Sequence, residues 1–343
     1  MNTTQMLLGF SHCDGTPGSE QNAIEYAKTL LEPYGDCWVS PLGSLLCNVR
    51  KAEEGEPNLL LDAHLDEIGL VVTFITEDGF LRVAECGGVD LRSLLASPVW
   101  VHTRGGKIPG VICSVPPHLS AGTDKKNPDP KDLYIDIGLN GEAAKATVRM
   151  GDRITFQSYP AELMNSRISG KAFDDRAGCV TILKALEYLG DNIHCGLTVQ
   201  FSSMEEIGGF GAKTAAFQVN PTHALAVDAS FAMTPDSKRE ECGDMGSGPM
   251  VGYAPVLSHT MSRRLEELAE QNSIPHQAEI MNSRTGTNAD QIALTRSGVK
   301  TALLSFPQRY MHTPNEVVAV KDIEDTGRLI AAWVQDIQKG GSY

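Results

Sequence analysis

The stretch Asn58-Leu-Leu-Leu-Asp-Ala-His64 decides the fold class of this chain. It is a short apolar run that ends in polar side chains. This pattern is typical of a strand that is buried on both faces and carries functional groups at its carboxyl end. The sequence therefore predicts an α/β framework built around this strand.

The segments on either side support that framework. Residues 22–34 place apolar side chains at helical spacing and end against Pro33 and Gly35, which predicts a first helix. After Ala172 helices and strands alternate again. Helices are predicted over 176–189, 209–217, 262–271, 289–296 and 322–339, and strands over 196–202, 224–227 and 302–305.

The region between Glu67 and Tyr159 has a different character. Gly, Pro, Asn and Asp separate strand-like runs over 69–75, 98–103, 111–115, 134–137 and 153–156. We predict a mixed sheet flanked by helices, formed by residues 1–66 and 162–343, and an inserted small β-barrel-like domain over 67–161. Residues 125–131 are predicted to form an exposed loop.

The charge balance excludes two classes of partner. The chain has 343 residues with 29 basic and 43 acidic side chains, which gives a net charge of −14. Such a charge opposes attraction to nucleic acid phosphates and to anionic membranes. The longest apolar run, residues 68–75, is far shorter than the roughly 18 residues of a membrane span. We expect neither nucleic acid nor membrane as a partner.

The cysteines and the amino terminus indicate the compartment. The eight cysteines are scattered without a Cys-x-x-Cys pair, so they are expected to be reduced thiols. The first residues lack the basic region and long apolar core of a secretory signal. The cytoplasm is therefore the expected location.

Potential metal ligands follow predicted strands at several separated places. Each residue alone has an ordinary alternative as a capping or solvated side chain, and a Glu-Glu pair is also common at a helix start. The repetition is more informative, because the carboxyl ends of parallel strands meet in one crevice. These places hold His64 with Asp66, Asp174 with Asp175, Glu205 with Glu206, Asp228, and His312.

This set has a chemical logic. Two histidines and three carboxylates can hold two zinc-like ions when one carboxylate bridges them. A neighbouring carboxylate that is not a ligand can take the proton of a water that attacks a carbonyl. Glu205 and Glu206 offer one candidate for each role, because adjacent side chains in an extended segment diverge.

Five strings carry a resemblance to a known family. The chain resembles the tetrahedral aminopeptidases, co-catalytic metallo-aminopeptidases that include glutamyl and deblocking enzymes and some proteins described as endoglucanases. The match runs in order over nearly the whole chain, and the β insertion falls where the family has its dimerisation domain. The strings are Ala63-His64-Leu-Asp66-Glu-Ile-Gly69, Lys171-Ala-Phe-Asp174-Asp175-Arg-Ala-Gly178, Glu205-Glu206-Ile-Gly208, Val227-Asp228 and Met311-His312-Thr-Pro-Asn-Glu316.

The resemblance implies a role for each residue. Asp174 would bridge two divalent metal ions, with zinc favoured and cobalt or manganese also accepted. His64 and Asp228 would complete the shell of one ion, and Glu206 and His312 the shell of the other.

Further roles concern residues beside these ligands. Glu205 would be the general base and Asp66 would orient the His64 ring from behind. The peptide bond after Asp174 would be cis. The substrates would be short peptides, and dimers would assemble into a tetrahedral shell of twelve subunits.

One departure from the family pattern bears on specificity. The family usually has Gly-Thr-Asp where this chain has Gly286-Thr287-Asn288. The change predicts either an altered preference for the N-terminal residue or a helix-capping role for Asn288. An acidic substrate would need a basic pocket, for which Arg284, Arg296 and Arg309 are candidates.

Two other functions stay open at this point. One is hydrolysis of a different bond, such as a glycosidic bond, by paired carboxylates. The other is a catalytically silent scaffold that binds peptides. A glycosidase has no use for two histidines and a bridging aspartate, and intact ligands argue against a silent scaffold.

Overall fold

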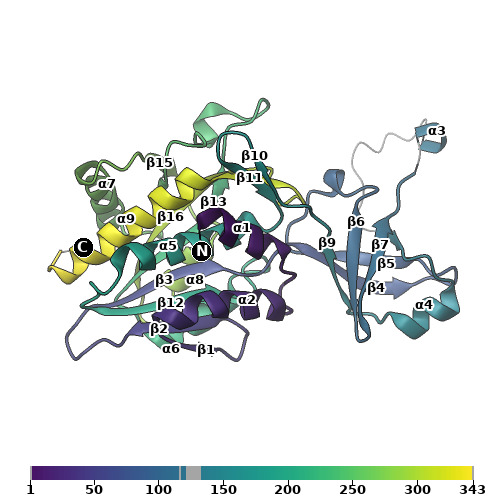
Figure 1. The fold of residues 1–343 in the computed structure, drawn as a ribbon, viewed down its shortest axis with the longest axis horizontal. Coiled ribbons are helices and arrows are strands. Elements are labelled where there is room, and N and C mark those ends of the chain that lie inside the picture. Colours follow the sequence, from purple (N-terminus) through teal and green to yellow (C-terminus); the bar gives the residue numbers. More distant parts are fainter. Residues whose placement is uncertain (1, 116, 121–132, 342–343) are drawn as a thin grey trace.

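The computed structural model describes residues 2–115, 117–120 and 133–341. The chain forms an elongated molecule with an α/β unit at one end and a small barrel at the other (Figure 1). The strands of the barrel lie between Gly69 and Phe156, within the predicted insertion. The exposed loop predicted over 125–131 falls outside the described residues.

A mixed sheet forms the centre of the α/β unit. Its four middle strands, β12, β3, β13 and β16, run parallel, and the other strand pairs are antiparallel except for the parallel pair β14–β15. The described strands, in spatial order, are β1 (Asp36–Val39), β2 (Leu45–Arg50), β12 (Gly196–Ser202), β3 (Asn58–His64), β13 (His223–Phe231), β16 (Lys300–Arg309), β17 (Glu316–Ala319), β11 (Arg167–Gly170) and β10 (Ala161–Leu163), with β14 (Met250–Tyr253) and β15 (Gln277–Ile280) joined beside β16.

Helices cover both faces of this sheet, as expected because β3 is apolar on both of its faces. Leu59 and Leu61 face the larger core, and Leu60 faces a smaller one on the opposite side. On the larger-core side lie α1 (Thr3–His12), α2 (Gln21–Leu31), α5 (Phe173–Leu189), α7 (His259–Gln271) and α9 (Val320–Gln338), and on the other side lie α6 (Phe210–Val219) and α8 (Asn288–Ala293).

The insertion is a closed antiparallel barrel. Its strand order is β4 (Gly69–Ile75), β5 (Leu81–Cys86), β8 (Tyr134–Asp136), β7 (Gly106–Ile112), β6 (Pro98–Thr103) and β9 (Arg153–Phe156). Closure leaves no unpaired edge strand, and a separate apolar core fills the interior. The short helices α3 (Pro117–Ser120) and α4 (Gly141–Thr147) belong to the same region. The predicted fold class is confirmed.

Some elements differ from the sequence prediction. Strand β7 begins at Gly106, although Gly and Pro in this segment indicated a turn. Pro109 is accommodated because β8 pairs with β7 only at Val111 and Ile112. Strand β5 and helices α1 and α4 were not predicted, and α4 is held at its start by the Asn140 side chain, which accepts from Ala143 N.

The longest helix of the described ranges, α9, has 19 residues. Over those ranges none combines the length and the apolar character that crossing a membrane requires.

Candidate active site

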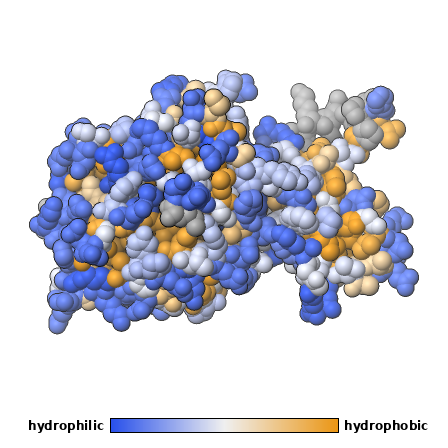
Figure 2. Space-filling view, in the orientation of Figure 1, coloured by the Kyte–Doolittle hydropathy of each residue, from blue (hydrophilic) through white to orange (hydrophobic). Residues whose placement is uncertain are grey.

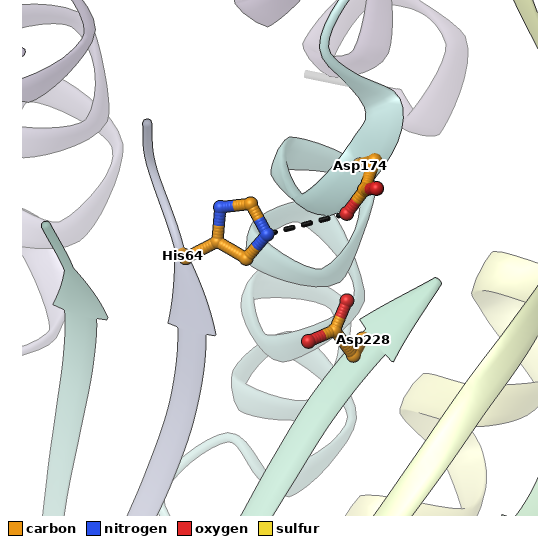
Figure 3. A group of neighbouring side chains, drawn as sticks. All are labelled: His64, Asp174 and Asp228. Carbon is orange, nitrogen blue, oxygen red and sulfur yellow. Dashed lines mark hydrogen bonds and ion pairs between the residues drawn. The ribbon is translucent and has the colours of Figure 1, made fainter. Parts of the chain in front are cut away.

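The carboxyl edge of the sheet brings the predicted ligands together. His64 is the last residue of β3. Ala226 of β13 pairs with Asp62, so Asp228, two residues further on, reaches the level of His64. Asp174 lies in the first turn of α5. Figure 3 shows the carboxyl groups of Asp174 and Asp228 near the His64 ring.

Two groups of three candidate ligands share one aspartate. His64 Nε2 lies 3.2 Å from Asp174 Oδ1, and His312 Nε2 lies 3.3 Å from Asp174 Oδ2. Candidate ligand atoms of His64, Asp174 and Asp228 all lie within 4.8 Å of one another, as do those of Asp174, Glu206 and His312. The structure thus gathers all five predicted ligands, with Asp174 between the two groups.

The turn after β12 carries the two glutamates. Asp66 Oδ1 accepts from Glu205 N at 3.0 Å and Asp66 Oδ2 from Glu206 N at 3.1 Å. Glu205 Oε2 lies 4.0 Å from His64 Nε2. The Asp66 carboxylate therefore orients the backbone of the turn, and that turn directs Glu205 and Glu206 to the same crevice.

The His64 ring is held mainly by a different part of Asp66. His64 Nδ1 lies 3.0 Å from the main-chain carbonyl oxygen of Asp66 and 3.6 Å from its carboxylate. A proton on Nδ1 satisfies the carbonyl and fixes the ring so that Nε2 faces Asp174 Oδ1. Asp66, the residue predicted to orient the ring, thus contacts it more closely through its carbonyl oxygen than through its carboxylate.

Two buried carboxylates support the site in ways that the sequence did not indicate. Asp175 Oδ2 accepts from His64 N at 3.0 Å. Glu316 Oε2 accepts from Phe173 N at 2.6 Å and from Asp174 N at 3.2 Å. Glu316 lies within the Met311–Glu316 string, which was the one available signal. The expected cis bond between Asp174 and Asp175 is present.

Burial and like charges shift the pKa values of the acidic groups. Burial, reinforced by the Asp66 and Asp174 carboxylates, raises the pKa of Glu205 to about 7 against the influence of His64. Burial also raises the pKa of Glu206 well above its usual range, and the charge of Asp174 adds to this. Burial opposes the ionisation of Asp174 too, but hydrogen bonds from the histidines hold its pKa well below its usual range.

This arrangement fits a metal centre. Several carboxyl groups stand close together in a buried crevice, and divalent cations relieve the repulsion between their ionised forms. Imidazole nitrogens and carboxylate oxygens are also the donors that zinc, cobalt and manganese accept.

Comparison with known proteins defines the family. Residues 43–329 match the profile of the M42 glutamyl aminopeptidase family. The chain belongs to the M42 family. Members of this family are metal-dependent peptidases, so this chain is a peptide hydrolase. The resemblance drawn from its motifs is confirmed.

The M42 relatives extend along nearly the whole chain. The lysyl aminopeptidase of Pyrococcus furiosus is 31% identical over 304 residues, which cover 88% of this chain and 87% of that protein. Aminopeptidase APDkam598 from the archaeon Desulfurococcus kamchatkensis has a TM-score of 0.89 and 33% identity, covering 98% of this chain and 97% of its own. The TET1 peptidase of Pyrococcus horikoshii, which can assemble into a tetrahedron or a large octahedral shell, has a TM-score of 0.86 and 31% identity, with coverages of 97% and 99%.

A cavity of about 620 Å³ opens beside the ligands of this M42 chain. Ser230, Glu279 and Ser305 form part of its wall, and both serine hydroxyls donate to the Glu279 carboxylate. Asp290 also contributes, and its carboxylate accepts from the Thr285 hydroxyl at 2.9 Å. Both acidic side chains are thus engaged by the protein itself.

Of the three candidate arginines, one lies at this cavity. Arg284 contributes to its wall and makes no ion pair with the described residues. Arg296 donates to the carbonyl oxygen of Phe217, and Arg309 to that of Met233. Arg284 is exposed, so its guanidinium is available to a ligand.

Asn288 does not have the helix-capping role considered for it. The Thr287 side chain caps α8 by accepting from Ala289 N. Asn288 is buried and donates through Nδ2 to Ser202 Oγ at 2.7 Å. It is not among the residues that line the cavity. The departure from Gly-Thr-Asp therefore changes the support behind the carboxyl edge of the sheet.

Proposed function

We propose that the chain removes N-terminal residues from short peptides with two divalent cations and Glu205 as the general base. The observation that supports this most is the pair of three-residue groups that share Asp174. His64, Asp174 and Asp228 would hold one ion, and Asp174, Glu206 and His312 the other. Zinc is the favoured metal, and cobalt and manganese suit the same donors.

Two such ions polarise a scissile carbonyl and lower the pKa of water. Glu205 would take the proton at its carboxylate and later donate it to the leaving amine. Glu205 Oε2 lies 4.0 Å from His64 Nε2, so this carboxylate stands beside the two groups of candidate ligands without belonging to either. Asp66 would act by positioning the turn, since its oxygens accept from Glu205 N and Glu206 N.

The test uses one peptide set in two forms, with free and with acetylated N-termini. Incubation with the protein plus zinc or cobalt is expected to shorten the free peptides stepwise, as followed by mass spectrometry. EDTA is expected to abolish cleavage, and elemental analysis to find two metal ions per chain. Cleavage that persists in EDTA, or no cleavage with any metal, contradicts the proposal.

The same experiment separates the two alternatives. A carboxylate glycosidase keeps its activity in EDTA, because no metal takes part in its mechanism. A silent scaffold cleaves nothing yet still binds peptide. The metal-ligand pattern favours the aminopeptidase, since neither alternative needs two histidines around a shared aspartate.

We also propose that the barrel mediates assembly, first into dimers and then into a twelve-subunit tetrahedral shell. The P. horikoshii relative forms such closed shells. Large apolar side chains are exposed on the barrel, where orange surface is visible in Figure 2. They include Phe74, Phe80, Val111, Val115, Leu119 and Met150. In this arrangement residues 1–66 and 162–343 are the catalytic domain and 67–161 the assembly domain.

Sedimentation tests the assembly. A species of about twelve subunits is expected, and a stable monomer contradicts it. The shell would admit short peptides and exclude folded proteins, and the expected location is the cytoplasm.

Arg284 supports a preference within this function. We propose that its guanidinium binds the side-chain carboxylate of an acidic N-terminal residue. It lies at the cavity beside the ligand groups, and the nearby Glu279 and Asp290 carboxylates are already engaged by hydroxyl donors. A charged hydrogen bond of this kind favours aspartate and glutamate over neutral residues.

A further inference from the structure

A second cavity lies away from the metal ligands. It has a volume of about 310 Å³ and lies between the outer surface of the barrel and the segment that joins α1 to α2. Its wall is polar and includes Thr16, Gln21, Asn22, Lys107 and Arg153. Nothing in the proposed peptidase mechanism uses these residues.

The barrel contributes two cationic side chains, Lys107 and Arg153, to this cavity, together with His102, whose pKa is lowered by burial so that its neutral form is favoured. The register places His102 of β6 opposite Lys107 of β7 and opposite Arg153 of β9, so the three side chains share one face. Lys107 Nζ lies 3.0 Å from Asp14 Oδ2, but no acidic partner of Arg153 occurs within the described ranges. This concentration of positive charge contrasts with a chain whose net charge is −14.

The single acidic side chain in the wall is already neutralised. Asp14 accepts from Lys107, from Lys171 Nζ at 3.1 Å, and from Thr155 Oγ1 at 3.0 Å. These cations hold the pKa of Asp14 well below its usual range despite its burial. Asp14 therefore does not balance the charge of Arg153 as well.

The α/β unit contributes the start of a helix. Gln21 and Asn22, the first two residues of α2, line the cavity, and no side chain caps this helix. Its N-cap residue, Glu20, instead accepts from Gly18 N at 2.7 Å and from Met204 N at 3.2 Å. The first turn of α2, which carries the positive end of the helix dipole, therefore borders the cavity.

A buried hydroxyl independently indicates a ligand. Thr16 is 1% exposed, and its Oγ1 has no hydrogen-bond partner among the described residues. Its methyl carbon would lie 2.4 Å from a β-carbon built on Gly69, so the methyl group is the part that faces β4. An unpaired buried hydroxyl is unfavourable, and a bound acceptor in the adjoining cavity would relieve it.

We propose that this cavity binds a phosphate-sized oxyanion. Arg153 and Lys107 supply charge, and Thr16 and the first turn of α2 supply neutral donors. The anion would join the barrel to the segment that ends at Glu20. The Glu20 carboxylate accepts from the main-chain N of Met204, the residue before Glu205. Binding would therefore stabilise the contact between the two units and the turn that carries the glutamates. The proposal does not depend on the peptidase mechanism.

Calorimetric titration of the metal-loaded protein with inorganic phosphate, at constant ionic strength in chloride, tests this proposal. Wild-type protein is expected to bind phosphate and to gain thermal stability from it. Arg153→Gln is expected to weaken binding at least about tenfold, because it removes a charged donor. Thr16→Val is expected to weaken binding several-fold without lowering the melting temperature of the phosphate-free protein, since it removes only the unpaired hydroxyl.

The matched control is Arg104→Gln, the same substitution at an exposed position in the β6–β7 turn, and it is expected to bind phosphate as wild type does. If Arg153→Gln fails to fold, the phosphate affinity of Thr16→Val still tests the proposal. Undetectable binding to wild-type protein, or equal binding by wild type and Thr16→Val, would overturn the proposal. Equal binding would assign the phosphate to another site, such as the metal centre.

Discussion

The barrel and the sheet bury different kinds of side chain. Along the described barrel strands the buried residues are apolar, with Thr155 as the polar exception. The carboxyl edge of the sheet instead buries a group of ionisable side chains. These are Asp62, His64, Asp66, Asp174, Asp175, Asp228 and Glu316.

This difference shows which part of the chain serves stability and which serves chemistry. Apolar burial in the barrel is favourable in itself. Burying carboxylates is unfavourable unless cations or donors compensate, so their presence at one sheet edge indicates a function that requires them. A change in the barrel should therefore affect folding, and a change at the sheet edge should affect activity.

The largest expected effect is that of Glu205→Gln. Removing the proposed base is expected to lower kcat/KM by about 100-fold to 10,000-fold. The melting temperature should stay the same or rise, because one of several crowded buried carboxyls is neutralised. Peptide hydrolysis, elemental analysis and thermal unfolding of the same preparation measure the three quantities.

Glu85→Gln is the matched control in the barrel, since Glu85 is exposed on β5 and should tolerate the change without effect. A Glu205→Gln enzyme with full activity and an intact metal content would exclude Glu205 as the base.

The opposite behaviour is expected of Leu81→Ala. Leu81 is fully buried in the barrel core, and such truncations destabilise proteins by about 2–5 kcal/mol. Urea unfolding should show this loss, while kcat for a short peptide, measured well below the melting temperature, should not change. A fall in kcat without a fall in stability would show that the barrel takes part in the chemistry, contrary to this division.

The sequence predicted the parts of the molecule whose pattern is local. Strand β3 and its apolar run coincide over Asn58–His64, because burial on both faces makes the run distinctive. The alternation of helices and strands after Ala172 was also predicted. Boundaries shifted where tertiary contacts extend an element, as in β16, which continues to Arg309 beyond the predicted 302–305 by pairing with β17.

The support behind the ligands could not be predicted from local pattern. Glu316 meets Phe173 N and Asp174 N across more than a hundred residues of sequence, and the Met311–Glu316 string does not indicate these partners. Met204 and His312 adopt left-handed backbone with φ of 57° and 61°, a conformation uncommon for such residues. Both lie at the site, where backbone strain is often retained for function.

A smaller effect is expected from Glu20→Gln. Burial, with the nearby Asp66 carboxylate, raises the pKa of Glu20 from 4.5 to about 7 in the folded protein. The folded state therefore binds this proton more tightly than the unfolded state. Wild-type protein should lose stability relative to the variant as the pH rises through this interval, by about 3 kcal/mol in total.

Urea unfolding of both proteins at about pH 5 and about pH 8 measures this difference. Glutamine keeps the Oε1 acceptor that serves Gly18 N and Met204 N, so the comparison isolates the charge. Glu25→Gln, at an exposed position of the same helix, should show no pH-dependent difference from wild type. If Glu20→Gln and Glu25→Gln showed the same pH dependence of stability, Glu20 would not be the group with the raised pKa.

The smallest effect concerns the wall of the cavity beyond the ligands. Arg284→Gln is expected to lower kcat/KM for anilides of glutamate and aspartate about tenfold, while anilides of leucine and alanine are unaffected. Anilides have no peptide C-terminus, so the loss reports on the side-chain carboxylate alone. Arg296→Gln is the matched control, because Arg296 bonds to Phe217 outside the cavity.

Arg284→Gln and Arg296→Gln should both keep the wild-type rate on neutral substrates. A failure of the Arg284 proposal can therefore be distinguished from a failure of the proposed metal centre. A wild-type enzyme that prefers lysine would instead indicate that Glu279, in the same cavity, selects the substrate. Specificity would then depend on the same kind of buried carboxylate as catalysis. A preference set by Arg284 would instead place selectivity on an exposed loop, which can change without disturbing the charges buried at the sheet edge.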